Sequence, residues 1–340
     1  MSFQPLLVTI AMPCLNEAAH VEACLRSVQR QTYPRDRIEM AIAEGGSTDG
    51  TREILARLAN EDPRIHVLDN PDRLQAAGLN RILLQAKGDV IVRMDVHCEY
   101  APDYVEKCVA VLERTGADNV GGAQRCRGRT EFEKAVCAAL SSPLGVGGAA
   151  YRSPDNEGYV DTVFLGAFRR GALERIGAWD PGAITNEDAE LNQRLVASGG
   201  RIYLSREIVV HYAPRGSLVS LARQYYRYGR GRARTLLKHR RFLSVRPALP
   251  FLVLGAGLAL VVALPWTNAA IYALLVAAVA LAAEATRVGA SGGLARVAVV
   301  LAVLPTVVLS HGSGFASGLV RYLLAPDWTE GGGLSLPSSP

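Results

Sequence analysis

A stretch of 37 consecutive residues without a charged side chain separates Arg246 from Glu284. Because a helix needs about 20 apolar residues to cross a bilayer, this stretch is long enough for two crossings. The segment 265–268, Pro-Trp-Thr-Asn, is typical of a turn at the membrane–water boundary. The alternative is a helical hairpin buried within a soluble protein. A second uncharged stretch predicts a third membrane segment over about 294–310, followed by a surface helix at 315–324.

Basic residues are concentrated just before the first apolar stretch. Residues 201–246 contain twelve Lys or Arg and one acid, in a chain whose net charge is only +5. A basic segment next to a membrane helix is typical of binding to the anionic lipids of the inner leaflet. Since no base-reading module accompanies it, we expect no nucleic acid as a partner.

The charge distribution also predicts a topology. The amino-terminal residues lack the pattern of a signal peptide, so we expect the first 240 residues to stay in the cytoplasm. Arg287 and Arg296 lie between the second and third apolar segments, which places that loop inside as well. We therefore expect a multi-pass protein of the cell inner (plasma) membrane with a cytoplasmic catalytic domain.

Six cysteines lie between residues 14 and 137, and none forms a Cys-x-x-Cys pair. Disulfides are rare in the cytoplasm, and structural zinc sites usually contain close cysteine pairs. This pattern predicts buried free thiols, with neither a disulfide nor a structural zinc.

Short β-branched runs alternate with amphipathic stretches in the first part of the chain. Such alternation predicts an α/β fold, in which a mostly parallel sheet carries helices on both faces. Ligands bind these sheets at the carboxyl ends of the strands. The strands are predicted over 6–11, 38–43, 65–68 and 90–94, and the helices over 18–31, 51–60, 75–85 and 104–114.

Five short motifs follow one another in a characteristic order. They read Met-Pro-Cys-Leu-Asn-Glu at 12–17, Ser-Thr-Asp-Gly-Thr at 47–51, Arg-Met-Asp-Val-His at 93–97, Asn-Glu-Asp at 186–188 and Gln-Tyr-Tyr-Arg-Tyr at 224–228. In this order they resemble the motifs of the family 2 glycosyltransferases, whose fold is called GT-A. The resemblance covers residues 6 to about 235, and it implies inverting sugar transfer from a nucleotide donor.

The resemblance implies that the first motifs bind a UDP-sugar. Pro13 and Glu17 would contact the nucleotide, although Glu17 also suits the first turn of a helix. Glu44 stands where the family has an acid that accepts a hydrogen bond from uracil N3–H. Asp49, which alone would suit a plain turn, matches a second nucleotide-contacting acid. Arg73 would reach the diphosphate or the base.

The segment 93–97 stands where the family has Asp-x-Asp, which implies a divalent cation, Mn²⁺ or Mg²⁺. Asp95 would contact the donor through this metal, with His97 as a second ligand. Imidazole in place of a carboxylate favours Mn²⁺. His211 would be a further metal or diphosphate ligand; the alternative is a histidine at a strand end with no ligand role.

The catalytic assignments rest on the acidic motif. Inverting transfer needs a carboxylate opposite the leaving nucleotide, and the resemblance implies that Asp188 is this general base. Its alternative role, an acid at a helix N-terminus, is compatible with catalysis. Glu187 would orient the base or bind the acceptor. Gly166 and Ala167 fit a loop that lines the sugar and acceptor pockets.

The last motif resembles Gln-x-x-Arg-Trp of membrane polysaccharide synthases. Gln224 and Arg227 match that motif, and Tyr228 takes the place of Trp. The resemblance implies contacts with the acceptor and the diphosphate. The alternative is an amphipathic anchor with Arg among the headgroups and Tyr at the boundary.

These inferences divide the chain into a cytoplasmic catalytic domain (1–216), a basic amphipathic interfacial segment (217–246), a membrane domain (247–325) and a disordered tail (326–340). The resemblance implies transfer of glucose or a related hexose from a UDP-sugar to a polyprenyl-diphosphate-linked glycan, in exopolysaccharide biosynthesis. Two or three helices are too few to line a polysaccharide channel, which argues against a processive synthase. The alternatives are a polyprenyl-monophosphate sugar transferase and a non-catalytic scaffold of a polysaccharide assembly complex.

Overall fold

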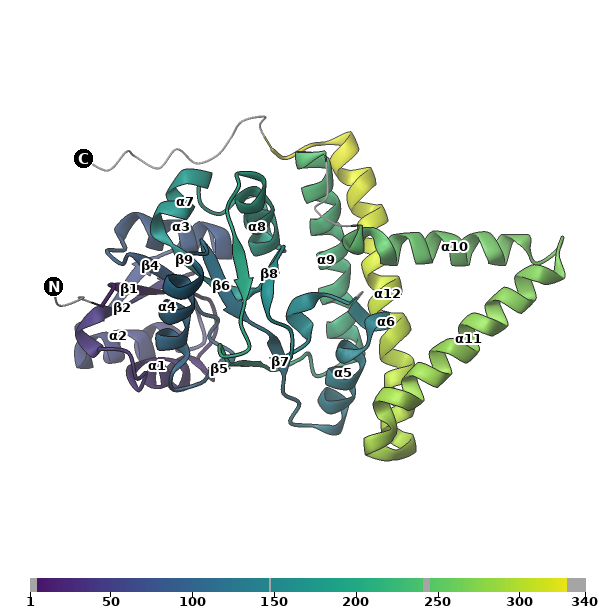
Figure 1. Ribbon diagram of the computed structural model, residues 1–340, viewed down its shortest axis with the longest axis horizontal. Coiled ribbons are helices and arrows are strands. Elements are labelled where there is room, and N and C mark those ends of the chain that lie inside the picture. Colours follow the sequence, from purple (N-terminus) through teal and green to yellow (C-terminus); the bar gives the residue numbers. More distant parts are fainter. Residues whose placement is uncertain (1–4, 147, 241–244, 329–340) are drawn as a thin grey trace. The chain divides into compact units, whose positions relative to one another are not determined.

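The structure, a computed structural model, describes residues 5–146, 148–240 and 245–328, which form two compact units (Figure 1). The first unit contains the described residues up to 125, together with 153–212, and the second contains 126–152 and 213–328. This division departs from the expected boundary at residue 216, because residues 126–152 pack with the C-terminal helices. Most of the expected tail, 329–340, lies outside the described residues.

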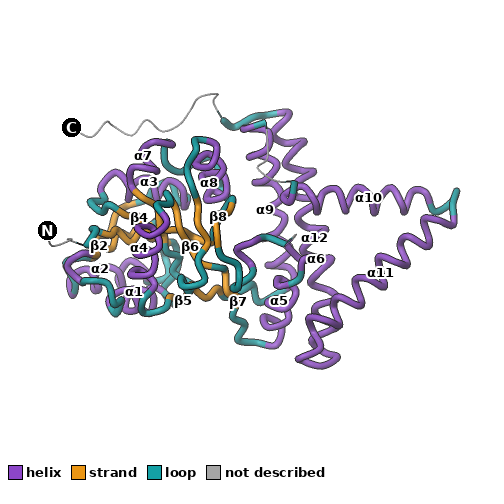
Figure 2. Tube along the Cα trace, viewed as in Figure 1, coloured by secondary structure: helices purple, strands orange, loops and turns teal. Residues whose placement is uncertain are grey.

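An eight-stranded mixed sheet forms the centre of the first unit (Figure 2). Its strand order is β3-β2-β1-β4-β9-β6-β10-β8. The strands β1 to β4 are parallel, as predicted, whereas β9 enters antiparallel between β4 and β6. The strands are β1 (Val8–Cys14), β2 (Ile38–Glu44), β3 (Ile65–Asp69), β4 (Val90–Arg93), β6 (Asn119–Gly122), β8 (Gly158–Val160), β9 (Phe164–Arg169) and β10 (Ile202–Leu204).

Helices cover both faces of this sheet, which confirms the α/β prediction. Alternate residues of β1 separate the two layers: Ile10 and Met12 pack with α1, α2 and α4, and Ala11 packs with α3 and α7. A small second sheet has the order β5-β11-β7. The bounds are α1 (Val21–Gln29), α2 (Thr51–Glu61), α3 (Gln75–Gln85), α4 (Tyr104–Thr115), α7 (Arg170–Ile176), α8 (Glu187–Ala197), β5 (Cys98–Tyr100), β7 (Gln124–Cys126) and β11 (Val210–Tyr212).

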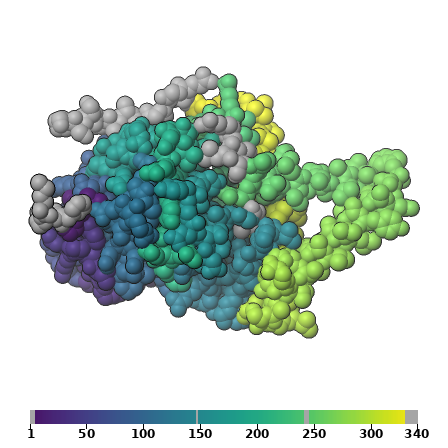
Figure 3. Space-filling model, viewed as in Figure 1, coloured from purple at the N-terminus to yellow at the C-terminus, as the bar shows by residue number. Residues whose placement is uncertain are grey.

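The second unit is helical. Two of its segments, Arg246–Ala263 and Asn268–Leu324, are long and apolar enough to cross a membrane. The α10–α11 hairpin, green in Figure 3, exposes apolar side chains along its length; Leu258 is 59% exposed and Val262 is 64% exposed. The helices are α5 (Glu131–Ser141), α6 (Pro143–Val146), α9 (Leu218–His239), α10 (Leu249–Ala263), α11 (Asn268–Gly289) and α12 (Gly293–Leu324).

The helix α12 continues through Gly312 and Gly314, across the boundary expected between the third membrane segment and a surface helix. The surface helix predicted at 315–324 is therefore not a separate element but the end of α12. A Cβ added at Gly314 would overlap the carbonyl oxygen of Tyr226 in α9, and one at Gly312 would lie 2.5 Å from the carbonyl oxygen of Pro250 in α10. These glycines let helices approach closely, so they serve packing rather than chain reversal.

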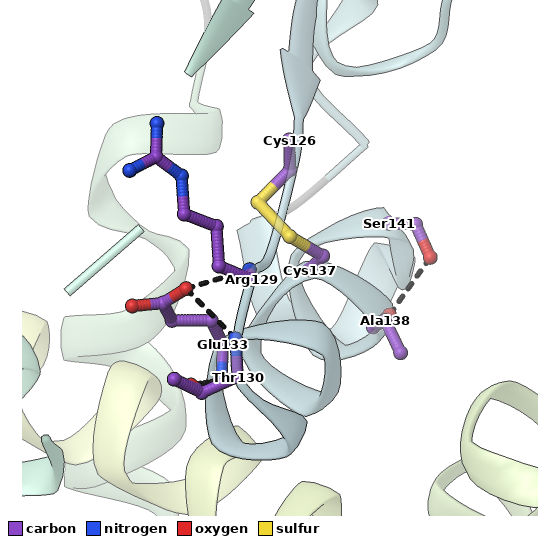
Figure 4. Close-up of a disulfide and its surroundings, with 7 residues drawn as sticks. All are labelled: Cys126, Arg129, Thr130, Glu133, Cys137, Ala138 and Ser141. Atoms are coloured by element: carbon purple, nitrogen blue, oxygen red, sulfur yellow. Dashed lines mark hydrogen bonds between the residues drawn. A yellow bond between two sulfur atoms is a disulfide. The ribbon is translucent and has the colours of Figure 1, made fainter. Parts of the chain in front are cut away.

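The prediction that the chain contains no disulfide is wrong: Cys126 and Cys137 form one (Figure 4). The bridge joins the end of β7 to α5, where the two Cα atoms are 5.3 Å apart. Sequence spacing does not show that a strand and the following helix fold back to bring two cysteines together. The remaining four cysteines are free and buried, as expected: Cys14, Cys24, Cys98 and Cys108.

Candidate active site

The loops that follow β1 and β2 are joined by hydrogen bonds. Thr51 Oγ1 accepts from the backbone N–H of Glu17 at 2.9 Å, and Asp49 Oδ2 accepts from that of Ala18 at 3.1 Å. The hydrogen bond from the Thr51 hydroxyl and that from Ala18 lower the pKa of Asp49. The structure thus brings Glu17 and Asp49 together at the carboxyl edge of the sheet, where nucleotide contacts were predicted.

Glu44 ends β2 and is only 2% exposed. Its carboxylate accepts from the backbone N–H groups of Gly46 at 3.0 Å and Ser47 at 2.6 Å, and it pairs with Arg52 at 3.2 Å. Burial acts to raise the pKa of Glu44, but the hydrogen bonds from Ser47 and Gly46 outweigh it and the pKa is lowered. Charged Glu44 therefore orders the loop that leads to Asp49.

Arg73 anchors the same loop from another side. Its guanidinium donates to the carbonyl oxygens of Gly45 and Gly46, each at 3.0 Å. Pro13, in β1, lies beside Ala43 of β2 in the parallel register. These two residues, both predicted to contact the donor, thus lie next to the loop that Glu44 orders.

Asp95, His97 and Cys98 follow β4 and form a group that could hold a metal ion, with ligand atoms within 4.8 Å of one another. Asp95 and His97 are partly exposed, at 15% and 32%. Glu17 Oε1 lies 3.9 Å from His97 Nδ1, which brings the β1 loop to the same place. Burial raises the pKa of the Cys98 thiol and so disfavours the thiolate that would bind a metal, which leaves Asp95 and His97 as the better donors for a divalent cation.

His211 is not part of this ligand group among the described residues. It lies in β11, where its register partner is Glu99, while the neighbouring Tyr212 is paired with Cys98. Side chains alternate along a strand, so His211 and Tyr212 lie on opposite faces of the small sheet. The ring of Tyr212 contacts His97, with centroids 6.1 Å apart, which places His211 on the other face.

The two predicted catalytic acids begin α8 and meet a buried arginine. Arg93 Nη2 lies 2.9 Å from Glu187 Oε1 and 3.5 Å from Asp95 Oδ1, and Nη1 contacts Asp188 Oδ1. The Arg93 side chain is 4% exposed, whereas that of Asp188 is 19% exposed. The metal-ligand candidate and the candidate base thus share one guanidinium.

Local geometry places the acids of α8. Asn186, before the helix, has a left-handed φ of 61°, which turns the chain into the first turn. Trp179 Nε1 donates to Asp188 Oδ1 at 3.1 Å, and Asn80 holds the backbone of Trp179 through two hydrogen bonds. Burial raises the pKa of both acids, that of Glu187 to about 7. A carboxylate with a raised pKa is suited to take up a proton near neutral pH.

Gly166 and Ala167 do not lie in a loop, which corrects the sequence prediction. Both belong to β9, where Ala167 pairs with Val92 and is fully buried in the core. Gly166 has a φ of 122°, and a Cβ there would lie 2.6 Å from the side-chain oxygen of Asn119. Packing of the sheet therefore accounts for both residues.

Gln224, Arg227 and Tyr228 lie in α9 of the second unit. Gln224 Nε2 donates to the Tyr228 hydroxyl at 3.0 Å, one helical turn apart. The Tyr228 ring packs edge-on against Tyr225, with centroids 5.6 Å apart. The motif is therefore ordered within its own helix, and its contact with an acceptor stays a prediction.

Sequence reasoning missed the roles of Arg93 and Trp179. Arg93 carried a detectable signal, because it is a charged residue at the end of an otherwise apolar predicted strand. Trp179 has no such signal in the sequence, because its indole N–H lies near Asp188 only as a result of the turn between α7 and α8.

Known proteins resemble this chain along most of its length. Residues 9–177 match the model for Glycosyl transferase family 2, and residues 163–286 match Glycosyl transferase family group 2. The chain is 42% identical to succinoglycan biosynthesis protein ExoA of Rhizobium meliloti (strain 1021), over 74% of this chain and 78% of that protein. It is 24% identical to a dolichyl N-acetyl-alpha-D-glucosaminyl phosphate 3-beta-D-2,3-diacetamido-2,3-dideoxy-beta-D-glucuronosyltransferase of Methanococcus voltae, over 72% of this chain and 78% of that enzyme.

Solved structures share the fold. The mannosyltransferase PcManGT of Pyrobaculum calidifontis, in complex with GDP-Man and Mn²⁺, superimposes with a TM-score of 0.67 at 21% identity, covering 94% of this chain and 88% of that one. TarS of S. aureus (residues 1–349), in complex with UDP, gives 0.50 at 12% identity, over 94% and 92%. The predicted GT-A fold is confirmed. With the 42% identity to ExoA, these findings show that the chain is a glycosyltransferase and belongs to glycosyltransferase family 2.

Proposed function

We propose that this protein is a membrane-anchored, inverting hexosyltransferase of exopolysaccharide biosynthesis. It moves a sugar from a UDP-sugar to a glycan acceptor on polyprenyl diphosphate at the cytoplasmic face of the inner membrane. The name of the Rhizobium meliloti relative supports a role in polysaccharide assembly. The name of the Methanococcus voltae relative, whose acceptor is a lipid-linked sugar, supports a lipid-borne acceptor.

The observation that carries this proposal is the placement of Asp188. Its carboxylate is partly exposed, has a raised pKa and is held by Arg93 and Trp179. In an inverting transfer, such a carboxylate takes the proton of the acceptor hydroxyl as that oxygen bonds to the anomeric carbon. Glu187, which is 8% exposed and bonded to the same guanidinium, orients the base.

Asp95 and His97 fit a divalent cation. Their ligand atoms converge at the end of β4, and both side chains reach solvent. Oxygen and imidazole donors suit Mn²⁺, and Mg²⁺ to a lesser degree. When bound, the cation supplies positive charge to the diphosphate leaving group. The complex of PcManGT with GDP-Man and Mn²⁺ supports a metal in this role.

The loop between β2 and α2 is the proposed nucleotide site. Asp49 is charged and exposed at its tip, and Glu44 and Arg73 hold it in shape. Because the imide N3–H of uracil is a donor, a site rich in carboxylate acceptors suits UDP. The complex of TarS with UDP supports the same nucleotide.

The second unit is the proposed membrane anchor. The α10–α11 hairpin exposes apolar side chains, whose contact with water costs free energy. The helix α9 carries basic side chains that suit anionic lipid headgroups. We assign the acceptor and its diphosphate to the same helix, at Gln224, Arg227 and Tyr228. The chain would then meet its lipid-linked acceptor at the membrane surface.

The test is UDP release by the purified full-length protein in lipid nanodiscs, with a panel of UDP-sugars, Mn²⁺ and a lipid extract from an exopolysaccharide producer. We expect UDP release with one UDP-hexose, and only when the lipid extract is present. A labelled product should then appear in the lipid fraction. Asp188→Asn should lower turnover roughly 10²- to 10⁴-fold with little change in UDP affinity. Turnover with GDP-sugars alone would contradict the UDP assignment, and labelled water-soluble product alone would contradict the lipid acceptor.

A further inference from the structure

Arg93 is buried where a cation is costly. It ends β4 after Val90, Ile91 and Val92, which are all fully buried, and its own side chain is 4% exposed. Burying a guanidinium costs free energy unless carboxylates pair with it. The fold therefore holds this charge in place through specific partners.

Those partners come from two distant parts of the sequence. Asp95 follows β4 directly, while Glu187 and Asp188 form the first turn of α8, more than 90 residues later. One guanidinium contacts all three carboxylates. Without it, three acids would crowd a largely dry site and repel one another.

We propose that Arg93 is a positioning residue for sugar transfer: its planar guanidinium fixes the Asp188 carboxylate relative to Asp95. The geometry thereby sets the distance between the base and the donor. This inference rests on the proposed role of Asp188 as the base. Arg93 acts through Asp188 and does not itself touch the substrate.

The shape of the side chain explains why arginine occupies this position. A guanidinium presents several N–H donors in one plane, so it bonds different carboxylates with different nitrogens. Here Nη2 serves Glu187 and Asp95, and Nη1 serves Asp188. A lysine ammonium is a single point charge and cannot keep this spacing.

A double-mutant cycle tests the proposal with full-length protein in nanodiscs. Turnover and UDP affinity in Mn²⁺ are measured for Arg93→Lys, Asp188→Asn and the double variant. Misplacing a reacting group by about 1 Å can cost on the order of 10²-fold, so we expect Arg93→Lys to lose roughly 10- to 100-fold in turnover. UDP affinity should change by less than about threefold, because the pair of Arg93 with the metal-ligand candidate Asp95, at 3.5 Å, is the longest of its three contacts and the described residues of the proposed nucleotide loop form no ion pair with Arg93. The double variant should turn over as slowly as Asp188→Asn alone.

Arg64→Lys is the matched control. Arg64 pairs with buried Asp62 at 2.6 Å, at the amino end of β3, away from the acidic edge of the sheet. We expect this variant to keep wild-type turnover. If Arg93→Lys melts at a lower temperature than the control, all variants are compared at a temperature at which each is fully folded, so that the loss in turnover does not report unfolding.

The outcomes distinguish failure of the positioning role of Arg93 from failure of Asp188 as the base. If the losses from Arg93→Lys and Asp188→Asn multiply, or if UDP affinity falls in parallel with turnover, Arg93 does not act through Asp188. Near-normal turnover of Asp188→Asn alone would overturn the proposed base and this inference with it.

Discussion

The indole Nε1 of Trp179 donates a hydrogen bond to Asp188 Oδ1 at 3.1 Å, and Arg93 contacts the same carboxylate oxygen. The Trp179 ring is fully buried and packs edge-on against Phe168, with centroids 5.7 Å apart. Asn80 in α3 fixes its backbone. The aromatic core of the first unit thus orients an acid at its surface.

Trp179→Phe removes this donor and keeps most of the ring packing. A hydrogen bond to a charged acceptor contributes about 1.5–3 kcal/mol, so turnover should fall roughly 10- to 100-fold. UDP affinity should not change. Steady-state UDP release measures the loss, with Trp266→Phe, an exposed tryptophan of the α10–α11 turn, as the control. Wild-type turnover of Trp179→Phe would show that this hydrogen bond does not matter for the reaction.

The residues around Asp188 show which parts of the site could be predicted from the sequence. Glu44, Asp49, Asp95 and Asp188 were assigned from the resemblance to the ordered motifs of family 2, and the structure places them at or after the end of a strand or in the first turn of a helix. Arg93 contacts Asp188 from more than 90 residues earlier in the sequence, and Trp179 contacts it through the turn between α7 and α8; periodicity and short motifs encode neither contact.

For the fold, too, single helices and strands could be predicted from the sequence, whereas the pairing of distant strands could not. The predicted helix at 75–85 matches α3, and the four predicted strands overlap β1 to β4. The antiparallel insertion of β9 beside β4 went unseen, and for that reason Gly166 and Ala167 were assigned to a loop. Strand pairing depends on partners more than 70 residues away, which periodicity does not specify.

Chelation by EDTA should abolish sugar transfer, because Asp95 and His97 would lose the cation that offsets diphosphate charge. Mn²⁺ should restore activity at least as well as Mg²⁺. His97→Asp should keep activity and shift the preference toward Mg²⁺, since a carboxylate is a harder ligand. Activity is titrated against each metal, with exposed His66→Asp as the control. Full transfer in EDTA would rule out this metal site.

Asp62 should make stability depend on pH. It is 2% exposed, and hydrogen bonds from Arg64 hold its pKa well below the usual range despite burial. A lowered pKa stabilises the fold above the unfolded value of about 4, and this contribution is lost as pH falls through the folded pKa. Asp62→Asn should therefore cost about 1–3 kcal/mol at pH 7 and progressively less below about pH 4. Melting curves from pH 7 to 3 test this against Asp36→Asn, whose carboxylate is 81% exposed; a pH-independent difference would contradict it.

The disulfide predicts how many cysteines can be alkylated before and after reduction. Alkylation of the denatured protein without reductant should modify four cysteines, and after reduction it should modify six. Intact mass reports the number. Cys126→Ser is the control, with five modified in both conditions. Six modified cysteines before reduction would show that Cys126 and Cys137 are not joined.

Gly314→Ala should separate α9 from α12, because the new methyl group would overlap the backbone of Tyr226. Overpacking of this kind costs about 1–3 kcal/mol, so the melting temperature in detergent should fall. Gly255→Ala in α10 is the matched control, since a Cβ there meets nothing within 4 Å and alanine favours a helix. Equal melting temperatures for the two variants would contradict the close approach.

The backbone contact between α9 and α12 has a consequence for how the proposed membrane anchor would assemble. Gly229, Gly314 and Gly318 allow main-chain atoms of one helix to touch the other. Such contact is van der Waals attraction between fitted surfaces, which does not require water to expel apolar groups. These main-chain contacts can therefore form in a hydrocarbon as well as in an aqueous environment. A nascent chain could assemble these two helices before or after the apolar hairpin inserts, and either order would end in the same packing.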